Sequence, residues 1–300
     1  MSKRSAIILS LLGLFAVAEI AARVIGMDQF PIYRQDSEIK YFLAPNQRGD
    51  FLGHDYYTNE IGLPLPDTFD KNIHPSILLI GNSIIYGGNV FKQKEKLFTV
   101  LQDEMPAGQK LWPVALGGWT QVNEMAFLKR HDELIANADG FAWLYMSGGL
   151  TAATPWAGEY AFPTARPVCV SCYAVLRYGV IPLLPKLFPN ELPIRGAVDP
   201  VQYENFIATI KSIQNNRHYK YRSIIWLYPI KTELEIAKKG GDWLPERKKI
   251  TSLAADAGIT VIDIAASPLW TASLYRADGV HPTAEGNRAL AKILHDALIN

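Results

Sequence analysis

Two short segments near opposite ends of the chain carry residue types that together perform nucleophilic catalysis. In the first, Ser83 follows an apolar run at residues 77–80 and the dipeptide Gly81-Asn82, where a buried strand is expected to turn into a helix. At such a turn the serine hydroxyl is exposed beside a helix N-terminus, whose backbone N–H groups can stabilise an oxyanion. The same pattern also fits a serine that only caps the helix. Ser83 is therefore a candidate nucleophile with a structural alternative.

The second segment, residues 278–282, reads Asp-Gly-Val-His-Pro and stands directly before the last predicted helix. A histidine in this place can present one ring nitrogen to a serine, while a carboxylate three residues upstream holds the other nitrogen and fixes the tautomer. Asp278 and His281 are thus candidates for the orienting acid and the general base. Taken alone, Asp278 could start a turn and His281 could be an ordinary surface residue.

The elements that must position these residues alternate between strand and helix. Apolar runs predict strands at residues 77–80, 111–116, 141–146, 223–228 and 260–264. Helices are predicted at residues 121–137, 199–218, 245–257 and 283–299. The alternation predicts an α/β fold with a doubly wound, flavodoxin-like, mostly parallel sheet of five strands. Sites in such sheets form at the carboxyl ends of the strands, where Ser83 stands.

The N-terminus predicts a membrane segment. Lys3 and Arg4 precede a run without charges at residues 5–18, and a helix over residues 6–25 is just long enough for a bilayer core of about 30 Å. The positive-inside rule keeps Lys3 and Arg4 in the cytoplasm. The prediction is a single-pass anchor in a bacterial inner membrane with the C-terminal domain in the periplasm. A signal peptide cleaved after the Ala-Val-Ala of residues 16–18 is the alternative.

The chain divides into three predicted parts. Residues 1–26 form the anchor, and residues 27–75, which prolines and glycines interrupt, form an approach segment that packs on the domain. Residues 76–300 form the α/β domain. This domain carries a proline-rich insertion at residues 151–198, a long stretch without a clear element that is expected to have a function of its own.

Taken together, the motifs resemble the SGNH (GDSL-like) hydrolase family, in its membrane-anchored bacterial type. Residues 81–84, Gly-Asn-Ser-Ile, are similar to the nucleophile block with Asn in place of the usual Asp, and residues 278–282 match the last block. Gly118 best matches the second-block glycine, whose N–H would join that of Ser83 around the oxyanion. The resemblance covers about residues 40–150 and 200–300 and implies an SGNH-like fold with Ser83, Asp278 and His281 as catalytic residues.

The third block departs from the family pattern. The family places an Asn after the third strand as a further oxyanion donor, and this chain has Leu150 there. Loss of one such donor typically costs on the order of 10²–10³ in turnover. Either another side chain replaces it, with Ser147, Thr151 and Asn123 as candidates, or the protein is a weak or inactive member.

The resemblance implies a serine esterase or acyltransferase that acts on O-acyl groups of an extracytoplasmic glycan or on another ester. The alternative is a weak or inactive SGNH-like subunit with a structural role in a membrane protein complex. The apolar run at residues 173–188 is a candidate contact for such a complex, for lipid or for an acyl chain. It could instead fold back to cover an edge of the sheet.

Composition and cysteine count exclude several other functions. Thirty Lys and Arg against twenty-nine Asp and Glu give a net charge of +1, which does not favour nucleic-acid binding. Cys169 and Cys172 are the two cysteines, and a structural disulfide is the first interpretation in an oxidising periplasm, with free thiols the second. The histidines outside the last motif show no metal-ligand spacing, so neither a metal nor another cofactor is predicted.

Overall fold

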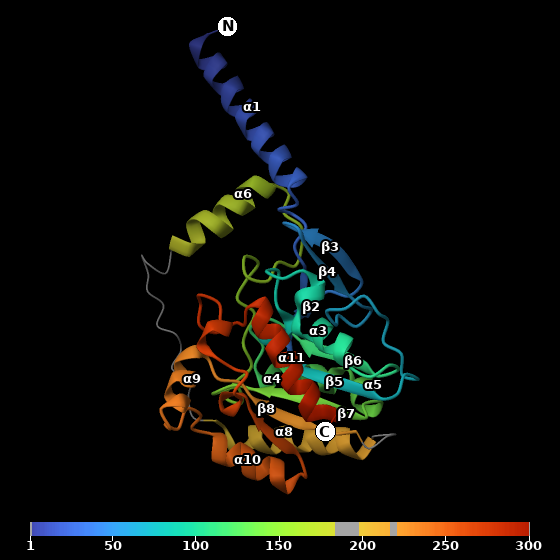
Figure 1. Cartoon of the computed structure of the whole chain (residues 1–300). Helices are drawn as coiled ribbons and strands as arrows, with labels where there is room; N and C mark the ends of the chain where they lie inside the picture. Colours follow the sequence, from blue (N-terminus) through green and yellow to red (C-terminus); the bar gives the residue numbers. More distant parts are fainter. Residues whose placement is uncertain (1, 184–197, 217–220, 300) are drawn as a thin grey trace.

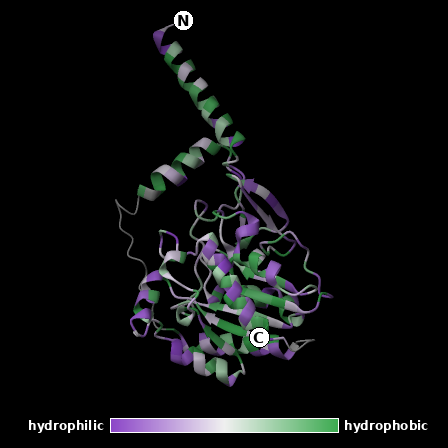
Figure 2. Cartoon of the chain, viewed as in Figure 1, coloured by the Kyte–Doolittle hydropathy of each residue, from purple (hydrophilic) through white to green (hydrophobic). Residues whose placement is uncertain are grey.

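The computed structural model describes residues 2–183, 198–216 and 221–299. An N-terminal helix, α1 (Lys3–Val24), extends away from an α/β domain (Figure 1). Ala22 is the buried residue of α1, and the surface of the helix is largely apolar (Figure 2). By length and composition α1 could cross a membrane, a property that a signal sequence shares.

A parallel sheet of five strands, in the order β6-β5-β7-β8-β9, forms the centre of the domain. The strands are β5 (Ser76–Gly81), β6 (Lys110–Ala115), β7 (Gly140–Tyr145), β8 (Ile224–Leu227) and β9 (Thr260–Asp263). Every residue of β5 and of β7 is buried, as expected for strands covered on both faces. This order confirms the predicted doubly wound, flavodoxin-like sheet. It also places the end of β5 at the switch point, where ligands bind in such folds.

Helices cover both faces of the sheet. On one face α3 (Leu97–Glu104) packs against α11 (Ala284–Ile299), and right-handed crossovers put α4 (Gln121–Arg130), α5 (Asp132–Ala136) and α8 (Pro200–Asn216) on the other. The remaining elements of the domain are α2 (Ser83–Tyr86), η1 (Gln93–Glu95), α9 (Lys231–Lys238), α10 (Arg247–Asp256), η4 (Ile264–Ala266) and η5 (Ala272–Leu274). The single helix predicted over residues 121–137 is two helices, because the backbone of His131 leaves the helical region between them. The end of the predicted helix at residues 217–218 lies outside the described residues.

The approach segment contains two antiparallel hairpins. The first pairs β1 (Tyr33–Asp36) with β2 (Lys40–Leu43), and the second pairs β3 (Gln47–Phe51) with β4 (His54–Thr58). Ile39, Tyr41 and Leu43 are buried in the core of the α/β domain. The approach segment therefore packs on the domain through the first hairpin.

The proline-rich insertion contains a helix that the sequence did not predict. Cys169 and Cys172 form a disulfide, and α6 (Val170–Ala174) continues through a π-helical turn, η2 (Val175–Val180), into η3 (Ile181–Leu183). The helix contacts α1 and points away from the sheet (Figure 1). The idea that residues 173–183 cover a sheet edge is therefore wrong. Residues 184–188 of the same apolar run lie outside the described residues.

Candidate active site

Ser83 is the first residue of α2, and Asn82 alone separates it from the end of β5. The cap of this helix is Asn82, whose side-chain Oδ1 accepts the N–H of Ile84 at 3.1 Å. The capping alternative is therefore wrong for Ser83, and the Ser83 hydroxyl makes a different contact. Its Oγ lies 2.9 Å from Nε2 of His281, a residue 198 positions further along the chain.

Asp278 holds the other side of the His281 ring. Oδ2 of Asp278 lies 3.1 Å from His281 Nδ1, while Oδ1 accepts the backbone N–H groups of Val280 and His281 at 2.9 Å each. When Nδ1 carries the ring proton and donates it to Asp278, Nε2 accepts a hydrogen bond from the Ser83 hydroxyl. The structure thus brings these three side chains together, and Asp278 both shapes the turn and holds the ring.

The electrostatics of Asp278 suit this arrangement. Partial burial acts to raise the pKa of the carboxyl group, but the N–H groups of His281 and Val280 and the His281 ring outweigh it, so the pKa lies below its usual value. The carboxylate is consequently ionised at neutral pH. An ionised partner at Nδ1 favours the tautomer that leaves Nε2 free to accept the serine proton.

The loop that carries His281 is held on both sides. The Tyr228 hydroxyl donates to the carbonyl of Val280 at 2.7 Å, and the N–H of Lys231 donates to the carbonyl of Gly279 at 2.8 Å. Burial keeps the pKa of Tyr228 well above its usual value, so this hydroxyl remains a donor. The end of β8 and the start of α9 thereby fix the height of His281 above the sheet.

A pocket of about 180 Å³ opens beside Ser83. Its lining comes from the ends of β5, β6 and β7, from the insertion and from the His281 loop: Asn82, Ser83, Gly118, Trp119, Thr120, Gln121, Met146, Gly149, Thr154 and Val280. Among the hydrogen bonds of the described residues, neither the N–H of Ser83 nor that of Gly118 has an acceptor. Both groups predicted to bind the oxyanion therefore line one pocket with the Ser83 hydroxyl and remain available to a ligand.

Gly118 has a backbone that only glycine adopts easily, with φ at 81°. A Cβ on Gly118 would lie 2.7 Å from the hydroxyl of Tyr41, which itself donates to the carbonyl of Gly117 at 2.9 Å. The indole of Trp119 donates to the carbonyl of Tyr41 at 2.9 Å. The approach segment thus braces the loop that presents the Gly118 N–H, a role for Tyr41 that no sequence motif indicated.

We expect Gly118→Ala to lower kcat/KM for a small ester about 10- to 100-fold, because the new Cβ would both strain a positive φ and collide with Tyr41, turning the N–H away from the pocket. Gly117→Ala is the matched control, since its Cβ would meet only Tyr86, at 3.8 Å. Steady-state hydrolysis of p-nitrophenyl acetate by both variants measures the difference. Equal activity of the two variants would remove Gly118 from the oxyanion site.

The third-block position carries no donor in the structure. Leu150 is fully buried in the hydrophobic core. The proposal that Asn123 replaces the missing donor is wrong, because its Nδ2 donates to the carbonyls of Ile39 and Thr154 and it does not line the pocket. Ser147 and Thr151 do not line the pocket either.

Gln121 brings a carboxamide to the third-block loop by another route. Its side chain occupies the space that a side chain at Gly149 would need, since a Cβ on Gly149 would lie 1.4 Å from Gln121 Oε1. Nε2 donates to the carbonyl of Leu144 at 2.7 Å, and the buried Oε1 has no partner among the described residues. Sequence reasoning missed Gln121, because it reads as an ordinary first residue of α4 and its meeting with Gly149 is visible only in three dimensions.

No protein-family model matches the chain, and no curated protein is detectably similar to it. Solved structures with a similar fold include TesA (11% identity, 75% of this chain and 98% of that chain, TM-score 0.46). A second is a catalytic mutant of an acetylxylan esterase from Geobacillus stearothermophilus, with 13% identity over 76% of this chain and 95% of that chain and a TM-score of 0.43. A third is the psychrotrophic esterase EstA from Pseudoalteromonas sp., with 13% identity over 74% of this chain and 96% of that chain and a TM-score of 0.40. Fold and site together define a doubly wound α/β protein with a Ser–His–Asp constellation at the carboxyl edge of its sheet.

Proposed function

We propose that the protein is a membrane-anchored serine esterase or acyltransferase of the SGNH type. The observation that carries the proposal is the hydrogen-bonded chain from Ser83 through His281 to Asp278, at the rim of a pocket with two available backbone N–H groups. Nucleophile, base and orienting acid in this order are the minimum set for acyl transfer through a covalent intermediate.

In the proposed reaction Ser83 Oγ attacks the acyl carbonyl carbon while His281 Nε2 takes the hydroxyl proton. The N–H groups of Ser83 and Gly118 hold the oxyanion, and His281 returns the proton to the leaving alcohol oxygen as the ester bond breaks. Water or a second hydroxyl group then attacks the acyl-enzyme. His281 takes the proton of this nucleophile and gives it back to Ser83 Oγ when the acyl group leaves.

The size of the pocket favours a short acyl group, because about 180 Å³ is less than the volume of pockets that enclose drug-sized ligands. Gly118 is exposed at its rim, so an acyl group carried by a large, hydrated molecule can reach Ser83 from outside. These features support O-acyl groups of an extracytoplasmic glycan as the substrate. Trp119 is a poor candidate for stacking on a sugar ring, since its indole is buried and donates to the carbonyl of Tyr41.

The proposed topology follows from α1 and the flanking charges. Residues 1–26 would anchor the chain in a bacterial inner membrane, with Lys3 and Arg4 on the cytoplasmic side. Residues 27–75 and the domain at residues 76–300 would then face the periplasm, where the disulfide of Cys169 and Cys172 is stable.

A catalytically inactive subunit of a membrane complex is the second candidate. The burial of Leu150, which leaves the third-block loop without its expected donor, favours this alternative. The two candidates differ in whether Ser83 is activated as a nucleophile, so they are separated by reactivity.

We expect a fluorophosphonate probe to label the detergent-solubilised full chain at Ser83, because His281 polarises this hydroxyl toward an electrophile. Gel fluorescence and peptide mass spectrometry measure the modification. Ser83→Ala should abolish the label, and Ser273→Ala, at an exposed serine of η5, should keep it. An unlabelled wild-type chain would favour the inactive subunit.

A further inference from the structure

The helix formed by Val170–Ala174, Val175–Val180 and Ile181–Leu183, named here the insertion helix, exposes several apolar side chains. Val175 is 64% exposed and Val180 is 42% exposed, and Figure 2 shows apolar residues along the segment. Arg177 is the charged residue in this helix. The α/β domain has its own hydrophobic core, so an exposed apolar surface of this kind indicates a site that contacts another molecule.

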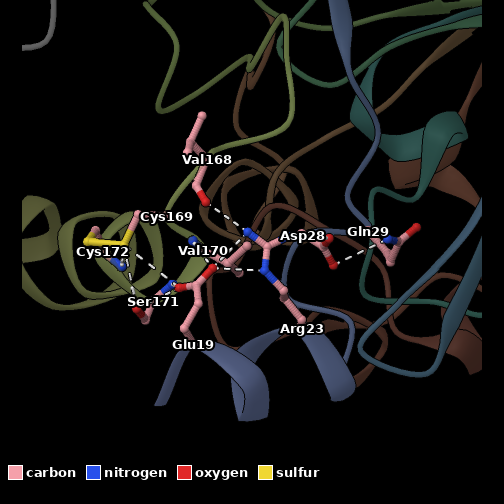
Figure 3. Close-up of polar contacts among 9 residues, drawn as sticks. All are labelled: Glu19, Arg23, Asp28, Gln29, Val168, Cys169, Val170, Ser171 and Cys172. Atoms are coloured by element: carbon pink, nitrogen blue, oxygen red, sulfur yellow. Dashed lines mark hydrogen bonds and ion pairs between the residues drawn. A yellow bond between two sulfur atoms is a disulfide. The ribbon is translucent and has the colours of Figure 1, made fainter. Parts of the chain in front are cut away.

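The insertion helix is fixed to the membrane-spanning candidate α1. The carboxylate of Glu19 accepts the backbone N–H groups of Val170 and Ser171 at 3.0 and 2.9 Å and the hydroxyl of Ser171 at 2.8 Å (Figure 3). The guanidinium of Arg23 forms an ion pair with the Glu19 carboxylate at 2.8 Å and donates a hydrogen bond to the carbonyl of Val168. The first turn of the insertion helix is therefore bonded to the side of α1 rather than to its end.

The position of Glu19 along α1 sets the depth of this junction. Glu19 precedes the last residue of α1, Val24, by five residues, which is about 8 Å along the axis. A carboxylate at that depth of a bilayer is costly unless other groups compensate its charge. The N–H groups of the insertion helix and the guanidinium of Arg23 supply this compensation. The first turn of the helix thus shares the depth of Glu19 when α1 spans a membrane.

The insertion helix is also tied to the approach segment. The ring of Tyr173 stacks on Phe30 at 5.1 Å between centroids. Within the helix, Arg177 donates to the Tyr173 hydroxyl at 2.7 Å and helps to fix that ring. Arg166, just before the helix, donates to the hydroxyl of Tyr56 at 2.9 Å. These contacts hold the helix in one orientation relative to both α1 and the approach segment.

We propose that the insertion helix lies in the headgroup region of the bilayer leaflet from which α1 emerges, with its exposed apolar side chains in contact with lipid. The proposal rests on α1 being the membrane anchor of the proposed function. Lipid is the occupant because the insertion helix is bonded to α1, begins at a depth inside its span and, like α1, exposes apolar side chains. A helix with apolar residues, tyrosines and a single arginine is suited to this interface.

The test places one spin label at a time on the full chain, reconstituted in vesicles of phosphatidylcholine and phosphatidylglycerol. Val175→Cys and Val180→Cys probe the insertion helix, and Val201→Cys, a 51% exposed valine on α8, is the matched aqueous control. Leu14→Cys reports on α1. The native cysteines are paired in the disulfide and stay unlabelled under non-reducing conditions. Collision with oxygen, which enters lipid, and with a nickel chelate, which stays in water, measures the exposure of each label.

We expect labels at 175 and 180 to be protected from the nickel chelate several-fold relative to the label at 201. Chelate accessibility at 175 and 180 equal to that at 201, with the label at 14 protected, would overturn the proposal and leave the anchor intact. If the label at position 14 is also accessible to the nickel chelate, both the membrane anchor and the proposal are overturned. Protection that occurs in native membranes but not in these vesicles would assign the surface to a protein partner instead.

Discussion

Asp278→Asn is expected to lower kcat/KM for a small ester by about 10³- to 10⁴-fold while the fold is kept. The amide oxygen of an Asn can still accept the two backbone N–H groups that Asp278 Oδ1 now binds. Its NH₂ group would then face His281 Nδ1 and donate to it. The ring proton moves to Nε2, which points at Ser83 and can no longer act as a base.

The matched control is Asp296→Asn on α11, where another aspartate lies 3.4 Å from a histidine Nδ1, that of His295, on the exposed side of the helix. Hydrolysis of p-nitrophenyl acetate and fluorophosphonate labelling should both fail in Asp278→Asn and persist in Asp296→Asn. Circular dichroism confirms that each variant is folded. Activity of Asp278→Asn within a few-fold of wild type would mean that Asp278 only shapes its turn.

Raising the pH from 4.5 to 8 is expected to destabilise the protein through Glu124. This side chain on α4 is fully buried and accepts the indole N–H of Trp143 at 2.6 Å. Burial raises its pKa from 4.5 to about 8, against the smaller opposing effect of that hydrogen bond. A raised pKa means that the folded state keeps a proton which the unfolded chain releases. The contribution of this proton to the free energy of unfolding is complete below pH 4.5 and is lost as the pH rises toward 8. The loss by pH 7 is on the order of 3 kcal/mol.

Glu124→Gln removes this titration, because the amide stays neutral and its oxygen can accept the Trp143 N–H. We expect the variant to gain unfolding free energy over wild type at pH 7–8 and to lose that gain near pH 4.5. Urea denaturation of the solubilised chain, followed by tryptophan fluorescence across this range, measures the difference. Glu104→Gln, at an exposed carboxylate at the end of α3, is the control for the change from a carboxylate to an amide at the surface. A difference between Glu124→Gln and wild type that does not depend on pH would contradict the assignment.

The buried strands and the two candidate catalytic segments were recognisable from sequence because their signals are local. The run at residues 77–80 is apolar at every position, which fits a strand covered on both faces. Asp278 and His281 form their contact within four residues of chain. Placing Ser83 beside them needed only the rule that strand ends of a parallel sheet share one edge.

Elements whose signal is weak or non-local were missed. The β3–β4 hairpin turns at Leu52-Gly53, where a leucine adopts a positive φ that its residue type does not indicate, and β3 carries polar residues instead of an apolar alternation. The helix α3 was missed because its eight residues are too short to give a clear helical repeat of apolar positions. The side chains of Tyr41 and Gln121 reach the site from parts of the chain that no motif connects to it.

The distance in sequence between Ser83 and His281 has a consequence for the timing of biogenesis. The nucleophile emerges 198 residues before its base. At a synthesis rate of about 5–20 residues per second, roughly 10–40 s separate the two. During export by the proposed route, β5 and the serine would already be outside while the ribosome still makes the base. A chain stalled or clipped before His281 would therefore reach the envelope with a serine that lacks its proposed base, so under the proposed function only molecules completed past this residue would modify their surroundings.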